Sequence, residues 1–388
     1  MDFTCSVKDF GAVGNGRHDD YSAIQAALDC GAARVIIPTG VYCISETLKV
    51  RSNTHIEADK TAKIVMKCTT RRKRNDFLLS NCDTLGGNVN ISISGGIWDG
   101  NNTAKENAKP DIFDKQGYSG TILNFVSVEN LSLSDMVLAN SVTFNLRICK
   151  VHNFTIENIS FTSDRCGHNQ DGIHFGGDVK HGTVRNIRAL SFGQTNDDMI
   201  ALNADDSIER VENLDLCRDC IEDISIENIY AESCHTIIRM LSVTAPIRNI
   251  RIKNIYGGFR CNAINADAAR YCRTPIFKES DYPEGVGAIS DVHIENFTCY
   301  PVLAPTNIPG TTPPTPNTAL FFESHMDNFS ITGFRYACDD SDAERCPALS
   351  AKNLHFQKIV VDGKTYYLNE KTDTLKVHSF ETLKMDRY

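Results

Sequence analysis

The chain has 388 residues, of which 41% are hydrophobic and 23% are charged, an ordinary globular balance that excludes a disordered or fibrous protein. Its 40 Lys and Arg against 49 Asp and Glu give a net charge of −9, which argues against nucleic acid as a partner, because the phosphate backbone requires a basic face. No run of about 18 apolar residues is present, so we expect no membrane-spanning helix and no membrane partner.

The N-terminus and the cysteines bear on the location of the protein. The chain opens without a charged region followed by an apolar stretch, so this sequence carries no secretion signal, although a processed secreted protein would begin in the same way. The 15 cysteines are scattered singly through apolar segments, which is typical of reduced, buried thiols and favours a cytoplasmic location. Cys217 and Cys220 form the only close pair and lack a second pair at zinc spacing, so no metal site is predicted.

One pattern recurs from residue 90 to residue 359. It consists of an Asn or Asp, a short segment with an apolar residue at every second position, and often another Asn. Such alternation is the β period, and the leading Asn or Asp suits a bend because it tolerates left-handed backbone. The copies start at Asn90, Asn130, Asn153, His181 (a weaker copy), Asp223, Asn249, Asp291, Asn328 and Asn353.

Strands this short cannot each bury a face alone, whereas stacked copies bury a continuous core. The sequence therefore predicts an all-β fold, a parallel β-helix, with residues 1–388 forming one domain. Residues 21–28 have the spacing of an amphipathic helix, which we expect to cap the N-terminal end of the solenoid. A β-propeller is the rival fold, but its longer blade repeat and hairpin turns are not visible.

The N-terminal segment adds a family resemblance. Residues 7–27, beginning Val-Lys-Asp-Phe-Gly-Ala-Val-Gly-Asn-Gly, resemble the opening signature of pectin-lyase-like proteins, and residues 35–42 resemble their next strand and turn. The resemblance implies a single-stranded right-handed parallel β-helix. It leaves the reaction type open, because hydrolases, lyases and phage tail proteins share this signature.

A second strand recurs once per coil and begins with polar residues. The alignment superimposes four isoleucines: Ile173, Ile200, Ile237 and Ile264. In this register Asp171, Asp198 and His235 form one column on three successive coils, and Asp197 lies one residue before Asp198. Carboxylates one strand spacing apart repel each other, so the pKa of at least one should rise. A protonated carboxyl group beside an ionised one is what cleavage of a glycosidic bond requires.

These segments are similar to the motifs of glycoside hydrolase family 28, the polygalacturonases and their relatives. That family shows Asn-Thr-Asp, Gly-Asp-Asp, Gly-His-Gly and Arg-Ile-Lys in this order along the chain. The first appears here as Asn-Gln-Asp at 169–171 and the second as Asn-Asp-Asp at 196–198. The third is reduced to Cys-His-Thr at 234–236, without the flanking glycines.

Carried over by motif position, the resemblance implies an inverting hydrolysis. Asp197 would be the general acid, Asp171 and Asp198 would hold and deprotonate the water, and His235 would orient the acid. Inversion predicts an acid-to-base separation of about 6.5–9.5 Å, which leaves room for the water molecule.

The fourth motif departs from the family. Its position falls at 265–267, which reads Asn-Ala-Asp, so both cations that bind a substrate carboxylate in the family are missing. Arg147 and Arg239 flank the acids and are candidate replacements. Asn169, His174 and Asn265 complete the predicted substrate-binding set.

Two further segments bear on the cleft. Residues 251–253 spell Arg-Ile-Lys, but they lie in the other strand of their coil and are not expected at the site. Residues 303–317 contain five prolines and are predicted to form a loop that either walls one end of the cleft, which would favour exo action, or is a surface insertion.

The predicted function is hydrolysis of a pectin-type polysaccharide or oligosaccharide, a galacturonide or a related sugar, without a cofactor. Two alternatives stay open. A polysaccharide lyase needs a basic proton acceptor and often calcium-binding acids, and the aligned column begins with no Lys or Arg. A non-catalytic carbohydrate-binding β-helix is disfavoured by the acids that are present and supported by the cations that are missing.

Overall fold

The computed structural model describes residues 3–67, 76–102, 120–205, 217–266, 286–315, 318–338, 346–352, 357–368 and 374–377. Within these ranges, strands dominate and all of them belong to one sheet. None of the described helices is long and apolar enough to cross a membrane.

The helical elements are a 3₁₀ turn at Val7–Phe10 and the helix α1 at Tyr21–Asp29. The strands of the N-terminal third are β1 (Thr4–Ser6), β2 (Asn15–Asp19), β3 (Arg34–Ile37), β4 (Val41–Ile44), β5 (Leu48–Val50), β6 (Thr54–Ala58), β7 (Lys63–Met66), β8 (Leu79–Asn81), β9 (Asn88–Ser94) and β10 (Ile97–Asp99). Those of the middle are β11 (Leu123–Ala139), β12 (Leu146–Thr162), β13 (Ile173–Phe175), β14 (Val179–Ala189), β15 (Asp198–Asn203), β16 (Ile221–Leu241) and β17 (Ile247–Ala266). The C-terminal strands are β18 (Ile289–Pro301), β19 (Thr318–Phe322), β20 (Met326–Tyr336), β21 (Leu349–Lys352), β22 (Gln357–Val361), β23 (Lys364–Leu368) and β24 (Thr374–Val377).

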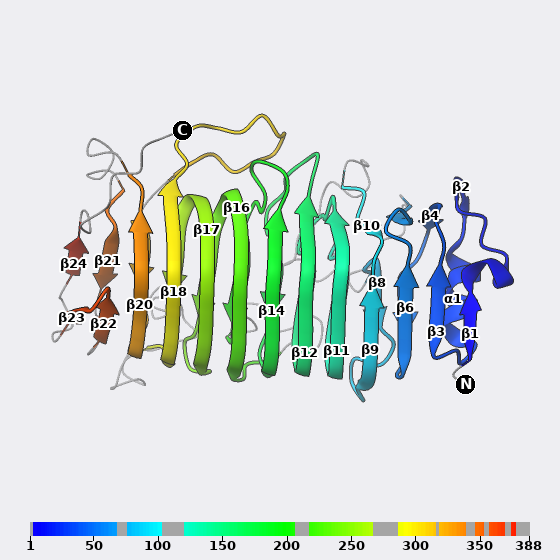
Figure 1. Ribbon diagram of the computed structural model, residues 1–388, viewed down its shortest axis with the longest axis horizontal. Coiled ribbons are helices and arrows are strands. Elements are labelled where there is room, and N and C mark those ends of the chain that lie inside the picture. The colour runs from blue at the N-terminus through cyan, green and yellow to red at the C-terminus, as the bar shows by residue number, and fades with distance from the viewer. Residues whose placement is uncertain are drawn as a thin grey trace, which may run out of the picture.

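The strands follow one another along the long axis of the molecule in chain order (Figure 1). Each long strand pairs in parallel with the equivalent strand of the next coil, as β11 does with β12 and β16 with β17. Antiparallel pairing occurs in the described part of the chain between β21 and β24 and between β22 and β23, at the C-terminal end. The predicted all-β parallel solenoid is therefore confirmed.

The interior is filled by rows of aliphatic side chains, one from each coil. The members of one row are at most 1% exposed, and the strand register stacks them in this order: Ile93, Leu133, Ile156, Val184, Ile226, Ile252, Ile294 and Ile331. Burying each such side chain contributes about 1.5–3 kcal/mol. The alternation that marked the repeats is thus the inward-facing half of each strand.

The Asn-led bends also form as predicted. The leading residue of every copy from 90 to 328 has a left-handed backbone, with φ between 50° and 62°; Asn353 lies outside the described residues. A second left-handed column follows five residues later, and its side-chain amides bond from coil to coil at 2.8–3.1 Å. Its members are Asp135, Asn158, Asn186, Asn228, Asn254 and Asn296. These ladders satisfy polar groups at the corners and fix the register between coils.

A helix is present where the sequence predicted one. It begins at Tyr21, lies beside β1 and β3 at the N-terminal end of the sheet (Figure 1), and buries Ile24, Ala27 and Leu28. Its role as a cap stays a prediction.

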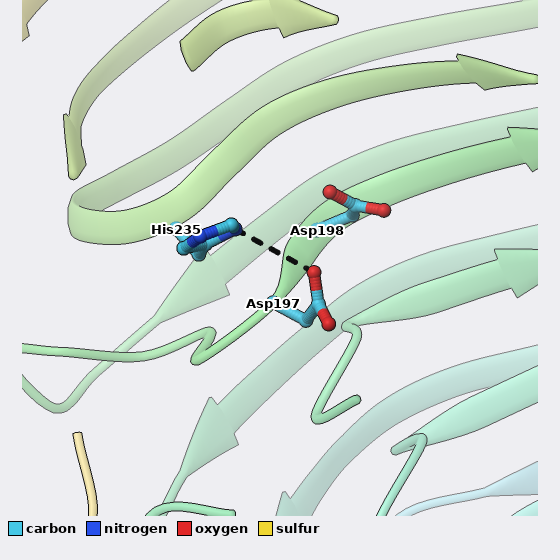
Figure 2. Close-up of side chains that lie close together, drawn as sticks. All are labelled: Asp197, Asp198 and His235. Atoms are coloured by element: carbon cyan, nitrogen blue, oxygen red, sulfur yellow. Dashed lines mark ion pairs between the residues drawn. The ribbon is translucent and has the colours of Figure 1, made fainter. Parts of the chain in front are cut away.

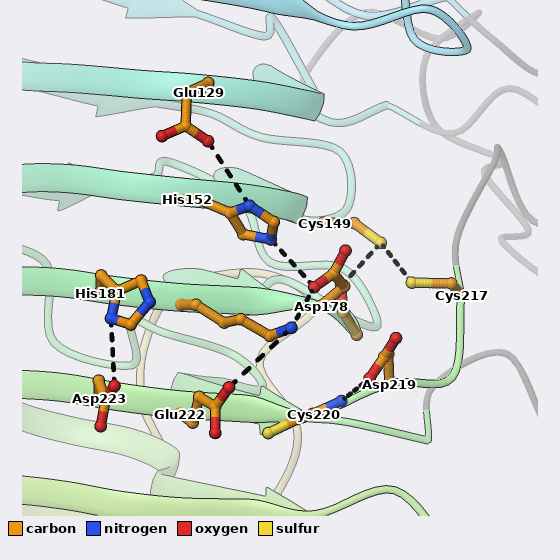
Figure 3. Close-up of polar contacts among 12 residues, drawn as sticks. Glu129, Cys149, His152, Asp178, His181, Cys217, Asp219, Cys220, Glu222 and Asp223 are labelled. Carbon is orange, nitrogen blue, oxygen red and sulfur yellow. Dashed lines mark hydrogen bonds and ion pairs between the residues drawn. The ribbon is translucent and has the colours of Figure 1, made fainter.

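A row of alternating charges crosses the outer surface of β11, β12, β14 and β16 (Figure 3). His152 lies 3.5 Å from Glu129 and 2.9 Å from Asp178, and Lys180 lies 2.9 Å from the same Asp178 oxygen. Although burial raises it, hydrogen bonds from Lys180 and His152 hold the pKa of Asp178 below its ordinary value. Asp178 therefore remains ionised, and its contact with His152 links two neighbouring coils.

The close cysteine pair does not assemble a metal site. The cysteines that the structure describes are free thiols. Cys217 Sγ lies 3.9 Å from Cys149 Sγ, whereas Cys220 lies apart from that pair, beside Glu222 (Figure 3). Among the described residues, the one group of three His, Cys, Asp or Glu with ligand atoms within 4.8 Å of one another lies elsewhere, at Asp197, Asp198 and His235.

Candidate active site

The register of the acid-bearing strands is the first feature of the site. β13 and β15 pair Ile173 with Ile200, as predicted, which places Asp171 opposite Asp198. β15 and β16 pair Ile200 with Ile238, and not with Ile237. The predicted column of Asp171, Asp198 and His235 is therefore wrong at its last member.

The next coil keeps the same register. Ile238, and not Ile237, also pairs with Ile264, and the irregular pairing of β16 with β17 between Ala231 and Thr236 leaves no net shift. Asp198 consequently faces Thr236. His235 moves one position back and reaches Asp197 (Figure 2).

Asp197 and His235 form a partly open pair. His235 Nδ1 lies 3.6 Å from Asp197 Oδ1, and the two side chains are 25% and 29% exposed. Burial opposes a charged imidazole, but hydrogen bonding to Asp197 and Cys261, together with the charge of Asp197, raises the pKa of His235 to about 10. The imidazole is therefore a cation at neutral pH, and its charge favours the ionised form of a carboxylate beside it.

Asp198 has the opposite character. Its side chain is buried, and burial followed by the charges of Asp197 and Asp171 raises its pKa well above the ordinary value, against the smaller effects of Arg239 and His235. The sequence predicted that one carboxyl group of the set would be held protonated and assigned that proton to Asp197. The raised pKa favours Asp198 as the group that keeps the proton.

Asp171 and His174 form a buried dyad. His174 Nδ1 lies 2.6 Å from Asp171 Oδ2, and the side chains are 1% and 4% exposed. The His174 ring stacks on Phe144, with 4.1 Å between ring centroids. The backbone of Asp171 is fixed as well, because Asn145 Nδ2 and N both donate to its carbonyl oxygen. His174 was predicted to bind substrate, and its side chain is buried between Asp171 and Phe144.

The separation of the acids bears on the stereochemistry. Asp197 and Asp198 bring carboxylate oxygens within 4.8 Å of each other, which is shorter than the roughly 6.5–9.5 Å that an inverting pair needs. Asp171 is not a member of that tight group.

The predicted substrate clamps separate into buried and accessible residues. Arg147 is 1% exposed, with Nε bonded to Asn124 Oδ1 at 2.8 Å, so it is closed to a ligand. Arg239 is half-buried and pairs in register with Asn265. The Asn265 Oδ1 atom is buried and has no hydrogen-bond partner. Asn169 is half-buried at a left-handed turn, with φ of 56°.

The fourth-motif segment lies only partly in the described structure. Asn265 pairs with Arg239, whereas the predicted alignment of Ile237 with Ile264 placed it opposite Ile238, so the predicted register is wrong by one residue here as well. Residue 267 lies outside the described residues. Arg251 and Lys253 pair with Ser225 and Glu227 in the Asn-led part of β17, one strand segment away from this row. Their placement agrees with the prediction that this tripeptide is not at the site.

Sequence reasoning missed Arg260. Its side chain is fully buried, and its Nη2 donates to Thr195 O at 3.0 Å and to Asn196 Oδ1 at 3.1 Å. It thus holds the segment that precedes Asp197. Burial lowers the pKa of its guanidinium. The one signal in the sequence was an arginine inside an otherwise apolar strand pattern.

The proline-rich loop also packs against this segment. Thr312 N donates to Asn196 Oδ1 at 2.8 Å, Thr315 N to Arg260 O at 2.9 Å, and Cys166 N to Pro309 O at 2.8 Å. The loop therefore reaches from β18 back to the segments that lead into Asp171 and Asp197. Its described part thus bonds to the residue before Asp197, and both interpretations of the loop, a wall of the cleft and a surface insertion, stay open.

The acid cluster contains donors that suit a metal ion. Two carboxylates and an imidazole lie within 4.8 Å of one another, which is a set that many divalent cations accept. A ligating imidazole must be neutral, however, and His235 is held protonated at neutral pH. The donor set therefore fits a resident metal poorly at neutral pH.

Comparison with known proteins gives the family context of this geometry. The family model described as rhamnogalacturonase A/epimerase, pectate lyase-like matches residues 4–260. Polygalacturonase ADPG1 of Arabidopsis thaliana is 24% identical over 272 residues, which cover 66% of this chain and 61% of that protein. The solved structure of a hyperthermoactive exopolygalacturonase from Thermotoga maritima superimposes with a TM-score of 0.58 at 15% identity, covering 97% of this chain and 96% of that one.

A relative of another kind also matches. The plasmin and fibronectin-binding protein A of Streptococcus pneumoniae is 28% identical over 177 residues, which cover 41% of this chain and 24% of that protein. The chain thus matches about a quarter of the length of this curated relative. The structural likeness at 15% identity establishes the shared fold, and the fold hosts several functions.

Proposed function

The chain belongs to the rhamnogalacturonase A/epimerase, pectate lyase-like family, and on that premise we propose that it is a glycoside hydrolase that cleaves a pectin-type polysaccharide or oligosaccharide by acid–base catalysis. The observation that carries the proposal is the assembly of three carboxyl groups with unequal environments from two neighbouring coils. Asp197 is open to ligand, Asp198 is buried with a raised pKa, and Asp171 is buried and bonded to His174.

Asp197 is the proposed general acid, because it is the carboxyl group that a glycosidic oxygen can reach. Asp197 and Asp198 lie close enough to titrate as a coupled pair that shares a proton. A bound sugar removes water from Asp197, which disfavours its charged form. Substrate binding therefore shifts the shared proton from Asp198 toward Asp197, where the leaving oxygen accepts it.

Asp171 is the proposed base. Its contact with His174 at 2.6 Å fixes its orientation, and it lies outside the tight group of Asp197, Asp198 and His235. A water molecule held between Asp171 and Asp198 would lose its proton to Asp171 as it attacks the anomeric carbon. This division of roles supports inversion, since attack and departure occur on opposite faces of the sugar.

Arg239 and Asn265 are the proposed substrate contacts beside the acids. Arg239 is a half-buried cation that pairs with Ala201, three residues after Asp198 on β15, and its charge acts to lower the pKa of Asp198. The unpartnered Asn265 Oδ1 on the next coil is a ready acceptor for a sugar hydroxyl. A guanidinium at this position suits a substrate carboxylate, which supports a uronic acid as the sugar.

Product analysis tests the proposal. The full chain is incubated with oligogalacturonides, rhamnogalacturonan fragments and neutral galactan oligosaccharides, and new reducing ends are measured together with ultraviolet absorbance. New reducing ends without absorbance establish hydrolysis. Growth of absorbance shows an unsaturated product and a lyase, and release of neither product from any substrate favours a carbohydrate-binding protein.

A further inference from the structure

A second sugar-sized groove lies outside the acid cluster, on the outer surface of β14 and β16. It encloses about 370 Å³ and is lined by Arg188, Ala189, Leu190, Tyr230 and Glu232, which falls within the usual range of about 300–1,000 Å³ for ligand sites. Arg188 and Tyr230 are partners in the strand register. Alternation along each strand points Leu190 and Glu232 to the same outer face.

A row of tyrosine rings on successive coils ends at the groove. Tyr230 stacks on Tyr256 of the next coil, with centroids 5.6 Å apart and planes inclined by 7°. Tyr256 in turn contacts Tyr300. On the opposite side of Tyr230 the register places Arg188 instead of another ring, so the second face of Tyr230 borders the groove. Tyr230 is 36% exposed and Leu190 is 60% exposed.

The polar groups of the groove are positioned for a ligand. Tyr230 Oη donates to Glu232 Oε1 at 2.8 Å, which fixes the ring and leaves the other carboxylate oxygen for hydroxyl groups. The neighbouring outer arginines Arg185 and Arg248 pair with Glu157 and Glu222. In the described part of the chain no hydrogen bond or ion pair occupies Arg188, so its guanidinium is available for an anion.

We propose that this groove binds one uronate residue of an acidic glycan, with the sugar ring on the free face of Tyr230, its carboxylate on Arg188 and its hydroxyl groups on Glu232. An aromatic face paired with an arginine and a carboxylate matches a ring that is apolar on one side, charged at one carbon and hydroxylated elsewhere. The choice of a uronate as ligand rests on the proposed function.

The groove is close enough to the acids to act on the same glycan chain. Tyr230 precedes His235 by five residues on β16, so the two are at most about 17 Å apart along the strand. A chain that passes over the acid cluster can therefore continue around the corner into the groove. The groove would hold a long substrate at a second point and leave the reacting sugar unchanged.

Hydroxyl-radical footprinting read by mass spectrometry tests this site residue by residue. The Asp197→Asn variant is used with trigalacturonate as the probe, so that the probe is not consumed. Oxidation of Tyr230 and Leu190 should fall when the probe is added, while Leu85, which is 82% exposed, should oxidise at an unchanged rate. Equal oxidation of Tyr230 with and without the probe would overturn the proposal.

Two comparisons fix the chemistry. An added Arg188→Ala change should raise the probe concentration needed for half-maximal protection about tenfold, as the loss of a charge-assisted contact does. The Arg335→Ala change, at the far end of the same outer row, should leave that concentration unchanged. Equal protection by neutral galactotriose would refute the uronate assignment. Turnover by the wild-type chain is measured separately, so protection without turnover rejects only the hydrolase proposal, and turnover without protection rejects only the groove.

Discussion

His235 lies opposite Asp197, with 3.6 Å between its Nδ1 atom and the nearer carboxylate oxygen, and not opposite Asp198. The pair combines an accessible carboxylate with an imidazole that is charged at neutral pH. It sets the electrostatics of the open side of the site, and its titration can be measured directly.

The imidazole of His235 should titrate near pH 10 when followed by nuclear magnetic resonance of its ring carbons. Because its folded pKa exceeds the ordinary value of about 6.5, the stabilisation it provides is complete below pH 6.5 and is lost as the pH rises through about 10. The Asp197→Asn change removes the main partner and should move the midpoint down. His55, whose pKa is lowered by burial, serves as the internal reference; an unchanged His235 midpoint would disprove the pairing.

The Asp197→Asn variant should lose turnover by about 10²- to 10⁴-fold on the oligosaccharide identified by product analysis, because the general acid is removed. Binding of that oligosaccharide, measured by calorimetry, should be retained. Asp164→Asn, a change at an exposed acid on a neighbouring turn, is the matched control and should be silent. Full turnover in the Asp197 variant would assign the acid elsewhere.

Asp198→Asn should stabilise the protein at neutral pH. A carboxyl group whose folded pKa is raised keeps its proton while the unfolded chain releases it, so the wild type loses stability as the pH rises above the ordinary value of about 3.9, by up to about 1.4 kcal/mol per pH unit. The Asp198→Asn variant has no carboxyl group at this position, so its free energy of unfolding does not fall in this way. Urea unfolding at pH 4 and pH 7 should show a gain that appears only at pH 7; an equal gain at both values would argue against a raised pKa.

His174→Ala should reduce kcat by up to about 100-fold, the cost of a misplaced catalytic group, with little change in KM. His174→Asn keeps a side-chain donor toward Asp171 and should recover part of the activity. A rise in KM at constant kcat would instead support the substrate-binding role predicted from the sequence. The midpoint of thermal unfolding is recorded for both variants to separate catalysis from folding.

Dialysis against a chelator should leave turnover unchanged. A divalent cation at Asp197, Asp198 and His235 must displace the proton of the imidazole, and the raised pKa of His235 opposes this at neutral pH. Loss of turnover that calcium or manganese restores would place a metal in the acid cluster and reopen the lyase mechanism.

Much of this architecture could be predicted from the sequence, because the determinants are local. Period-two alternation specifies which side chains fill the interior, and Asn or Asp marks the left-handed corners. These signals lie within a few residues of one another, so the repeats, the parallel stacking and the neighbouring positions of Asp171 and Asp198 were all predictable.

The register at the corner of β16 was not predictable in this way. Ile237 and Ile238 are both fully buried, so alternation cannot show which of them stacks on Ile200, and the pairing between coils selects Ile238. The burial of Arg147 and His174, the anchoring of Asn196 by Arg260 and the free face of Tyr230 likewise depend on contacts between distant segments. The solenoid and the set of acids thus follow from local sequence patterns. Which acid meets His235 and which cations a ligand can reach depend on the packing of the coils, because burial and charge–charge distances are not properties of a single strand.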